Sequence, residues 1–267
     1  MSHLLREHAP LTEADWGLID EEARSRLKVA LAARQLVDFD GPKGWSYSAT
    51  SLGRVTALAG NLVDGVTGAQ RRVLPVVELR ADFAISREEL RAAARGAEDA
   101  DLEALDEAAL NIALAENVAV FHGWEEAGIV GIAEASSNEP IPLGGQANQY
   151  PGAVARAAER LLRQGIPRPY GLALGPGCYR AVVETTEHGG YPVFEHLTEI
   201  TGGPLVRAPG VEGAVLVSLR GGDFLFSSGQ DLSIGYRTHD EDAVYLYLEE
   251  SFSFRVATPE AAIALTV

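Results

Sequence analysis

The sequence predicts an α+β fold, in which helices early in the chain pack on a sheet built largely by its last fifty residues. Residues 218–267 are almost all strand-forming or turn-forming, with turn clusters that cut the segment into the strand lengths of a β-meander. From Ala243 to Val256 apolar and polar residues alternate, which predicts one long strand with a buried face and a wet face; Tyr245, Tyr247 and Glu249 fall on the wet face. Residues 123–219 instead alternate short helical and strand-like segments, which indicates an inserted α/β subdomain.

Composition limits the classes of function. The chain has 267 residues, which allows one large or two small domains, and its 38 acidic and 22 basic residues give a net charge of −16. This charge argues against nucleic-acid binding, which depends on clustered cations. Cys178 is the only cysteine, so an intrachain disulfide is impossible and a reducing, cytoplasmic setting fits. Apolar stretches stay well short of the ~18 residues of a membrane span, so we expect a soluble, unexported protein with no membrane partner.

The N-terminal segment predicts one amphipathic helix. Thr12 is a good N-cap, and the acidic Glu13 and Asp15 in the first turn suit the positive end of the helix dipole. Apolar residues then recur at three- and four-residue steps, which predicts a helix from about Glu13 to Gln35 with a single apolar stripe. The stripe consists of Trp16, Ile19, Ala23, Leu27 and Ala30.

Residues 45–83 predict an excursion with two arms. Strand-like segments at residues 45–58 and 71–83 flank a turn region at residues 60–68. Two strands without a third strand or a covering helix are marginal in water. We therefore expect this segment to gain its order from a neighbouring molecule.

Regular elements fill the rest of the chain. Ser86 caps a short charged helix over residues 87–95, and residues 102–121 predict a long, mostly buried helix because they are rich in alanine and larger apolar residues. Pro151 stands near the first turn of a later helix and Gly165 stands past its end. The other expected elements are strands at residues 170–174, 205–208 and 214–219 and helices at residues 176–186 and 192–200.

Several motifs occur together in an order that is typical of one family. They are Ala9-Pro-Leu-Thr12 with Trp16, Gly41-Pro-Lys-Gly-Trp45, Phe121-His-Gly123, Arg220-Gly-Gly-Asp-Phe224, Gly229-Gln-Asp-Leu-Ser-Ile-Gly-Tyr236 and Glu250-Ser-Phe-Ser-Phe254. In this order the chain resembles the encapsulins of family 1, the linocin-type shell proteins, which have the Hong Kong 97 phage capsid fold. The resemblance implies a peripheral domain with a lumenal N-terminal helix (residues 1–44, 84–122 and 220–267), an extended loop (45–83) and an axial domain (123–219).

The resemblance implies a structural function. A non-catalytic protomer would self-assemble into a closed icosahedral nanocompartment in the cytoplasm, which would enclose a cargo enzyme through the cargo's C-terminal targeting peptide. Cargo in the family is typically a dye-decolourising peroxidase or a ferritin-like iron oxidase, with roles in oxidative stress or iron storage. The chain length and the compact loop suggest the smallest shell, of sixty subunits. Phage relatives join their subunits by lysine-to-asparagine bonds, which need a lysine in the extended loop. Residues 45–83 contain no lysine, so we expect a non-covalent shell.

Two other classes of protein remain open. A prophage major capsid protein would share the fold but usually carries an N-terminal scaffold or cleavable segment, whereas the first helix here starts by residue 13. A free-standing enzyme is the second alternative, and it would need a catalytic site.

The family also implies two candidate sites. The N-terminal helix and one strand of the closing meander form a groove for the cargo's tail, with Arg34 and Asp38 fixing the register of the peptide. The groove residues here are Leu27, Ala30, Leu31, Arg34, Val37, Asp38, Asp231, Leu232 and Ile234. A five-fold pore would be lined by Thr186, Glu187, His188, Gly189, Gly190 and Tyr191. The alternatives are that the first set only packs the helix on the sheet and that the second set is a surface turn.

We expect no catalytic residues and no metal site. His122 with Glu125 and Glu126 could offer metal ligands, but this region reads as a helix end, where a histidine suits the dipole. Cys178, His188 and an acidic residue could form a nucleophile set, but their spacing does not support one.

No cofactor is expected either. Gly175-Pro-Gly177 stands where a phosphate-cradling turn would, but the third glycine of the dinucleotide motif is missing and Pro176 lacks an N–H donor. Some relatives carry a flavin stacked on a tryptophan in the segment that corresponds to residues 83–90. This chain has no tryptophan there.

Overall fold

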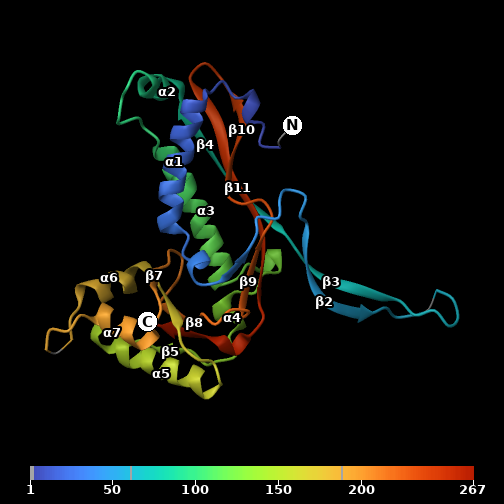
Figure 1. The fold of residues 1–267 in the computed structure, drawn as a ribbon, viewed down its shortest axis with the longest axis vertical. Helices are drawn as coiled ribbons and strands as arrows, with labels where there is room; N and C mark the ends of the chain where they lie inside the picture. Colours follow the sequence, from blue (N-terminus) through green and yellow to red (C-terminus); the bar gives the residue numbers. More distant parts are fainter. Residues whose placement is uncertain (1–2, 61, 188) are drawn as a thin grey trace.

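The structure is a computed structural model that describes residues 3–60, 62–187 and 189–267. In Figure 1 an upper lobe of helices on a sheet stands above a lower lobe of helices around a second sheet, and a two-stranded arm projects to one side. The α-helices are α1 (Glu13–Ala30), α2 (Arg87–Ala94), α3 (Glu103–Phe121), α4 (Ile132–Ala135), α5 (Tyr150–Arg163), α6 (Pro176–Glu184) and α7 (Val193–Thr201). Short 3₁₀ turns are η1 (Arg6–His8), η2 (Ala33–Gln35), η3 (Glu125–Ala127), η4 (Ala147–Gln149) and η5 (Pro259–Ala261). This mixed architecture confirms the predicted α+β class.

The strands form two main sheets and one separate pair. They are β1 (Asp38–Asp40), β2 (Ala49–Ala57), β3 (Ala69–Pro75), β4 (Val77–Ser86), β5 (Ile141–Pro142), β6 (Tyr170–Leu174), β7 (Leu205–Arg207), β8 (Ala214–Ser218), β9 (Phe224–Ser228), β10 (Ser233–His239), β11 (Ala243–Val256) and β12 (Ala262–Thr266). One sheet contains β1, β9, β11, β10 and β4, the other has the order β5-β12-β8-β6-β7, and β2 pairs with β3.

The long strand β11 is the centre of the upper sheet, as the sequence predicts. Strand β4 pairs with residues 243–252 along one edge, while β10 pairs with residues 244–249 and β9 with residues 252–256 along the other. All three neighbours run antiparallel to β11, and β1 adds to β9 in parallel. One strand therefore holds together segments from the start, the middle and the end of the chain.

The predicted wet face of β11 is buried in the middle of the strand. Tyr245 is half-buried, but Tyr247 and Glu249 are buried because the N-terminal segment crosses this face. His3 Nε2 lies 2.6 Å from Glu249 Oε1, and the N–H of Tyr236 in β10 donates to the carbonyl of Leu4 at 2.8 Å. The alternating pattern is real, but the prediction that it marks a solvated face is wrong for Tyr247 and Glu249.

Helices α1 and α3 cover this sheet with an apolar core. Buried residues of α1, α3, β4, β10 and β11 form one cluster with Leu90 of α2: Ile19, Ala23, Leu27, Ala30, Phe83, Ile85, Leu90, Leu105, Ala108, Ala109, Ile112, Ala113, Ile234, Val244, Leu246 and Leu248. Thr12 and Asp15 form the capping box that starts α1, which confirms the predicted start of the helix. The buried residues of α1 are members of the predicted stripe.

Helix α1 ends at Ala30, five residues before the predicted end. The side chain of Asn117 in α3 replaces the helical hydrogen bonds at this point: its Oδ1 accepts from the N–H groups of Ala32 and Ala33, each at 3.0 Å, and its amide donates to the carbonyl of Ala30 at 2.9 Å. The chain then forms η2, from which Arg34 projects. A contact between residues more than eighty positions apart thus sets the end of the helix.

The lower lobe surrounds the second sheet, and the predicted elements of residues 123–219 are all present there within two residues of their expected bounds. Pro151 lies in the first turn of α5 and Gly165 directly follows its last turn, as expected. One strand comes from outside this segment, because β12 pairs with both β8 and β5. The sequence had grouped residues 262–266 with the upper lobe, so this pairing is a correction to that grouping.

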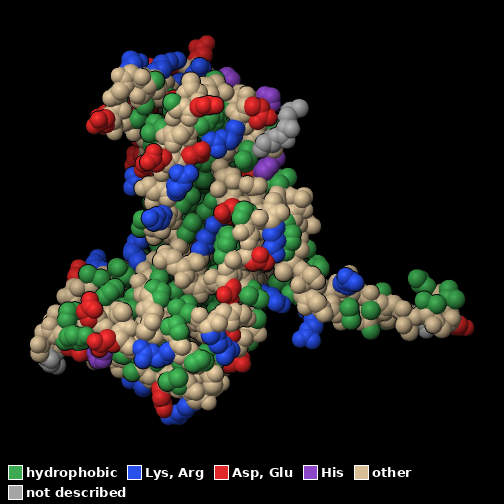
Figure 2. Space-filling model, viewed as in Figure 1, with side chains coloured by type: hydrophobic (Ala, Val, Ile, Leu, Met, Phe, Trp, Pro, Cys, Tyr) green, Lys and Arg blue, Asp and Glu red, His purple; other side chains and the backbone are tan. Residues whose placement is uncertain are grey.

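The arm consists of β2 and β3 and is largely exposed. The second strand-like segment of the prediction, residues 71–83, is divided between two sheets. Strand β3 stays in the arm, whereas β4 joins the upper sheet. Figure 2 shows hydrophobic side chains gathered at the tip of the arm. Leu58, Leu62, Val63 and Val66 lie at this end, and Leu62 is 100% exposed. No other described segment of the chain covers the apolar tip.

Candidate functional site: a groove between α1 and β10

A groove of about 490 Å³ lies between α1 and the edge strand β10. Its walls come from the N-terminal segment, from one face of α1 and from the turn that leads into β10. The lining residues are Leu4, Arg6, Asp20, Ala23, Arg24, Leu27, Lys28, Leu31, Arg34, Asp231, Leu232, Ser233, Ile234 and Leu248. Residues from the start of the chain (4–34) and from near its end (231–248) therefore build one concave surface.

The structure brings together six of the nine residues that the sequence assigned to this groove. These are Leu27, Leu31, Arg34, Asp231, Leu232 and Ile234. Ala30 is buried in the core of the upper lobe, and Val37 packs against the core of the lower lobe. Asp38 lies in β1, where its carboxylate accepts the N–H of Gly222 at 2.6 Å. These three residues lie apart from the groove surface.

The apolar residues of the groove differ in exposure. Leu27, Ile234 and Leu248 are buried and belong to the core of the upper lobe, so they form a floor that also holds α1 to the sheet. Leu31 and Leu232 are only half-buried at the edge of that core. A ligand in the groove could therefore gain apolar contact mainly with Leu31 and Leu232, and substitutions there would disturb the fold least.

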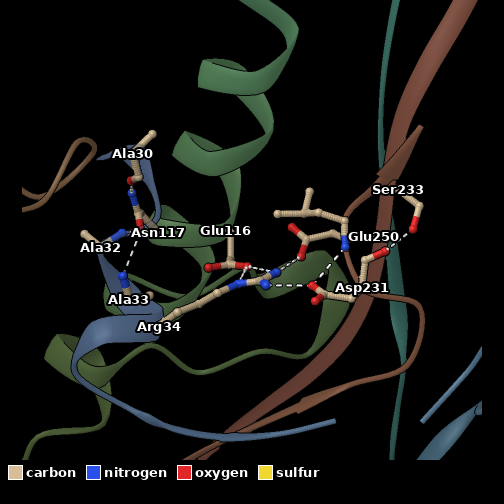
Figure 3. A network of polar contacts seen from close by, with 10 residues as sticks. Ala30, Ala32, Ala33, Arg34, Glu116, Asn117, Asp231, Ser233 and Glu250 are labelled. Carbon is tan, nitrogen blue, oxygen red and sulfur yellow. Dashed lines mark hydrogen bonds and ion pairs between the residues drawn. The ribbon is translucent and has the colours of Figure 1, made fainter. Parts of the chain in front are cut away.

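Arg34 lines the groove and contacts three carboxylates (Figure 3). Its guanidinium lies 2.7 Å from Glu116 of α3, 2.7 Å from Glu250 of β11 and 2.6 Å from Asp231. Glu116 and Glu250 are fully buried, whereas the side chain of Asp231 is 39% exposed. The Arg34 head group is thus directed into the protein and orients Asp231 at the wall of the groove.

Both buried carboxyl groups have a raised pKa, which favours the protonated form. One cation faces three carboxylates, and Glu116 Oε1 and Glu250 Oε1 are both buried without a hydrogen-bond partner among the described residues. Burial raises the pKa of Glu250 well above its usual value, and the nearby charge of Glu116 raises it further. Burial also raises the pKa of Glu116, although Arg34 opposes this shift. Protonation of Glu250 leaves Arg34 with one buried carboxylate and one surface carboxylate.

The sequence analysis missed Glu116 and Glu250. Each is an acidic residue at a position that the pattern predicts to be buried: Glu116 lies in the apolar helix α3, and Glu250 lies in the central strand. Buried acids are rare unless they are paired, so this position was itself a signal of a partner. Nothing in the local sequence points to Arg34 as that partner.

The residues of the predicted pore form a loop between α6 and α7. Thr186 pairs with Pro192, Glu187 Oε1 lies 3.0 Å from His196 Nδ1, and the hydroxyl of Tyr191 donates to Glu199 at 2.9 Å. His188 lies outside the described residues, while Gly189 and Gly190 are exposed. His196, which the sequence analysis did not single out, is therefore the described histidine beside Glu187.

The phosphate-turn candidate has a structural explanation. Gly175 caps α6, and a Cβ atom there would lie 2.2 Å from the carbonyl oxygen of Val211, so close packing requires this glycine. Cys178 is buried, and its Sγ accepts a hydrogen bond from the hydroxyl of Tyr150 at 3.7 Å.

His122 caps the end of α3, as predicted. Within residues 3–60, 62–187 and 189–267, no group of three or more His, Cys, Asp or Glu residues could hold a metal ion. The same ranges contain no helix that is long and apolar enough to cross a membrane.

Comparisons with known proteins identify the family. Residues 1–253 match the linocin M18 family model, described as an encapsulating protein for peroxidase. The type 1 encapsulin shell protein of Rhodospirillum rubrum is 48% identical over 99% of this chain and 96% of its own length. That of Brevibacterium linens is 41% identical over the whole of both chains.

Solved structures agree on the fold. The virus-like particle protein of Pyrococcus furiosus superposes with a TM-score of 0.60 at 19% identity, over 91% of this chain and 97% of its own. The Mycobacterium phage Bobi structure gives a TM-score of 0.57 at 16% identity, over 88% and 89%. The fold is the Hong Kong 97 capsid type, and the chain belongs to the linocin-type encapsulin family of shell-forming proteins.

Proposed function

We propose that this shell-forming chain encloses a cargo protein by binding the cargo's extended C-terminal tail in the groove between α1 and β10. The observation that carries the proposal is the groove itself, a concave surface with an apolar floor and two half-buried leucines, Leu31 and Leu232, beside a sheet edge. Grooves of this kind suit extended peptides, because the strand edge offers backbone hydrogen bonds and the pockets select side chains.

Affinity at one groove is expected to be weak. Two or three aliphatic side chains contribute about 1.5–3 kcal/mol each when buried, and ordering a flexible tail offsets part of this gain. An oligomeric cargo presents several tails inside one shell, so its total binding is much stronger than that of one tail. Micromolar binding at each groove is then enough for encapsulation.

Co-expression of the shell protein with a fluorescent protein that carries the cargo's C-terminal tail tests the groove. Leu31→Asp or Leu232→Asp should abolish co-purification of the tagged protein while intact shells still form. Val29→Asp is the matched control, because Val29 also lies on α1 but is 72% exposed and stands outside the groove lining. Full co-purification with both groove variants would overturn the proposal, as would an equal loss with Val29→Asp.

We infer that the shell is a closed, non-covalent homo-oligomer of sixty subunits in the cytoplasm, without catalytic activity, cofactor or nucleic acid. The net charge of −16 opposes nucleic-acid packaging. A peroxidase or a ferritin-like iron oxidase is the cargo class that we propose, and oxidative-stress or iron-storage roles would come from that cargo.

Negative-stain microscopy with an absorbance spectrum separates the candidate functions. Uniform hollow particles without nucleic acid support the shell, whereas particles filled with DNA would indicate a phage-type capsid. Monomers or small oligomers would contradict the shell and return a free-standing enzyme to consideration.

A further inference from the structure

The charged residues of the groove divide into paired and unpaired groups. Arg6 pairs with Asp20 at 2.7 Å, and Arg34 pairs with Asp231 at 2.6 Å. Arg24 and Lys28 also line the groove and are exposed. No ion pair or hydrogen bond connects either of these two side chains to another described residue.

The excess charge of the groove is therefore positive, although the protein as a whole is strongly acidic. Arg24 and Lys28 are four residues apart on α1, so they project on the same side of the helix. Lys28 is one of only two lysines in the chain, the other being Lys43. Two unpaired cations at one concave surface favour an anionic ligand group there.

Backbone groups of β10 face the same groove. Strand β10 stands at the edge of its sheet, and successive residues of a strand direct their N–H and C=O groups to opposite edges. The N–H of Tyr236 points away from β11, since it donates to the carbonyl of Leu4 at 2.8 Å. Two residues earlier, Ile234 must present its N–H and C=O in the same direction, along the groove.

We propose that the groove recognises an extended apolar peptide with a free carboxylate, which Arg24 and Lys28 bind while Ile234 pairs with the peptide backbone. This inference rests on the proposed function and adds the ligand chemistry to it. The carboxylate can come from the C-terminus of the peptide or from an acidic side chain, and the experiment below distinguishes these sources.

Fluorescence anisotropy with labelled decapeptides tests the proposal. The probes end in an apolar segment of alternating aliphatic and small residues and carry a free C-terminal acid, a C-terminal amide, or the amide with one glutamate placed before the apolar segment. Shells that have been disassembled, freed of cargo and reassembled provide empty grooves for the peptides. The free acid should bind about fivefold more tightly than the plain amide, which is the size expected for two exposed ion pairs. Raising the ionic strength should reduce this difference.

The Arg24→Gln/Lys28→Gln double variant should weaken binding of the free acid about fivefold and leave the plain amide unchanged. Both side chains are exposed, so the fold should tolerate the substitutions. Lys43→Gln is the matched control, because Lys43 pairs with Asp40 at 2.6 Å and lies outside the groove lining. It should bind all three peptides as the unmodified shell does.

Each outcome has a distinct meaning. If the glutamate peptide binds as tightly as the free acid, the groove recognises a carboxylate that a side chain can also supply. If it binds as weakly as the plain amide, the C-terminus is the source of the carboxylate. Equal binding of acid and plain amide, unaffected by the double variant, would overturn the carboxylate proposal and leave the groove intact. If none of the peptides binds, the proposed function fails together with it.

Discussion

A single side chain, that of Asn117, determines where α1 stops. It is fully buried and satisfies three backbone groups, at Ala30, Ala32 and Ala33. In the Asn117→Ala variant these groups would stay buried without partners, at about 1–3 kcal/mol for each one that cannot rearrange. We expect the free energy of unfolding to fall by about 3 kcal/mol in urea denaturation.

Asn111→Ala is the control for this prediction. Asn111 lies on the same helix but is exposed, so its replacement should change stability by less than about 0.5 kcal/mol. Equal stability of the two variants would show that the end of α1 does not depend on Asn117.

The raised pKa of Glu250 makes stability depend on pH. The folded-state pKa of Glu250 is raised well above the ordinary glutamate value of about 4.3, chiefly by burial and then by the charge of Glu116. Between these two pKa values the folded state binds more protons than the unfolded state, so stability falls as pH rises through this window. Arg34 contacts both buried carboxyl groups, and Asp231 contacts Arg34.

Glu250→Gln imitates the protonated acid and should remove this loss of stability. We expect the unfolding temperature of the wild type to decrease as pH rises through the window, whereas that of Glu250→Gln stays nearly constant. Glu78→Gln, an exposed residue on the neighbouring strand β4, should keep the wild-type slope. If all three proteins share one slope, the buried pair does not hold the proton.

At the scale of elements, β2 and β3 of the arm pair with no other strand of the described chain, and Thr50 at the base of the arm contacts Ser253 of β11 at 2.6 Å. A two-stranded ribbon is marginal alone, and the tip exposes apolar side chains, including Leu62 and Val63. Deleting residues 59–67 should therefore leave the lobes folded and the protein soluble, but unassembled or polydisperse. Size-exclusion chromatography, electron microscopy and circular dichroism measure these properties.

Val63→Ser/Val66→Ser is the companion variant, because it keeps the length of the arm and removes apolar surface from its tip. We expect assembly to be weakened but not lost. Normal particles from the deletion would show that the arm is dispensable for the shell, and loss of the circular dichroism signal would show that it belongs to the folding core.

Element positions were predictable because their signals are local. Thr12, Ser86, Pro151 and Gly165 mark helix ends through capping or backbone geometry, and the structure confirms each of them. The errors arose where distant residues decide the outcome. Asn117 ends α1 early, and the N-terminal segment buries the expected wet face of β11.

Across the whole molecule, the site was predicted in part for the same reason. The family resemblance located the two segments of the groove, and six of the nine assigned residues meet there. The buried acids Glu116 and Glu250 contact Arg34 across more than eighty and two hundred positions of sequence, so no local pattern could pair them. The pairing of β12 with the lower sheet has the same origin, because strand partners depend on topology.

An assembled shell would add a property that one chain lacks, an opening where copies meet at the five-fold axis. If the α6–α7 loop lines the five-fold opening, five copies of Glu187 would form an acidic ring that concentrates cations at its mouth. Each Glu187 is held by His196 at 3.0 Å, so its carboxylate has a fixed direction.

Glu187→Lys would convert the ring to positive charge and should slow iron(II) uptake severalfold in a shell loaded with a ferritin-like oxidase, measured as the rate of iron oxidation. His196→Gln should have a smaller effect, because the carboxylate remains but loses its orientation. Glu98→Lys makes the same charge change in the other lobe and should leave the rate unchanged. Equal rates for Glu187→Lys and Glu98→Lys would mean that cations enter elsewhere and that this loop is a surface turn.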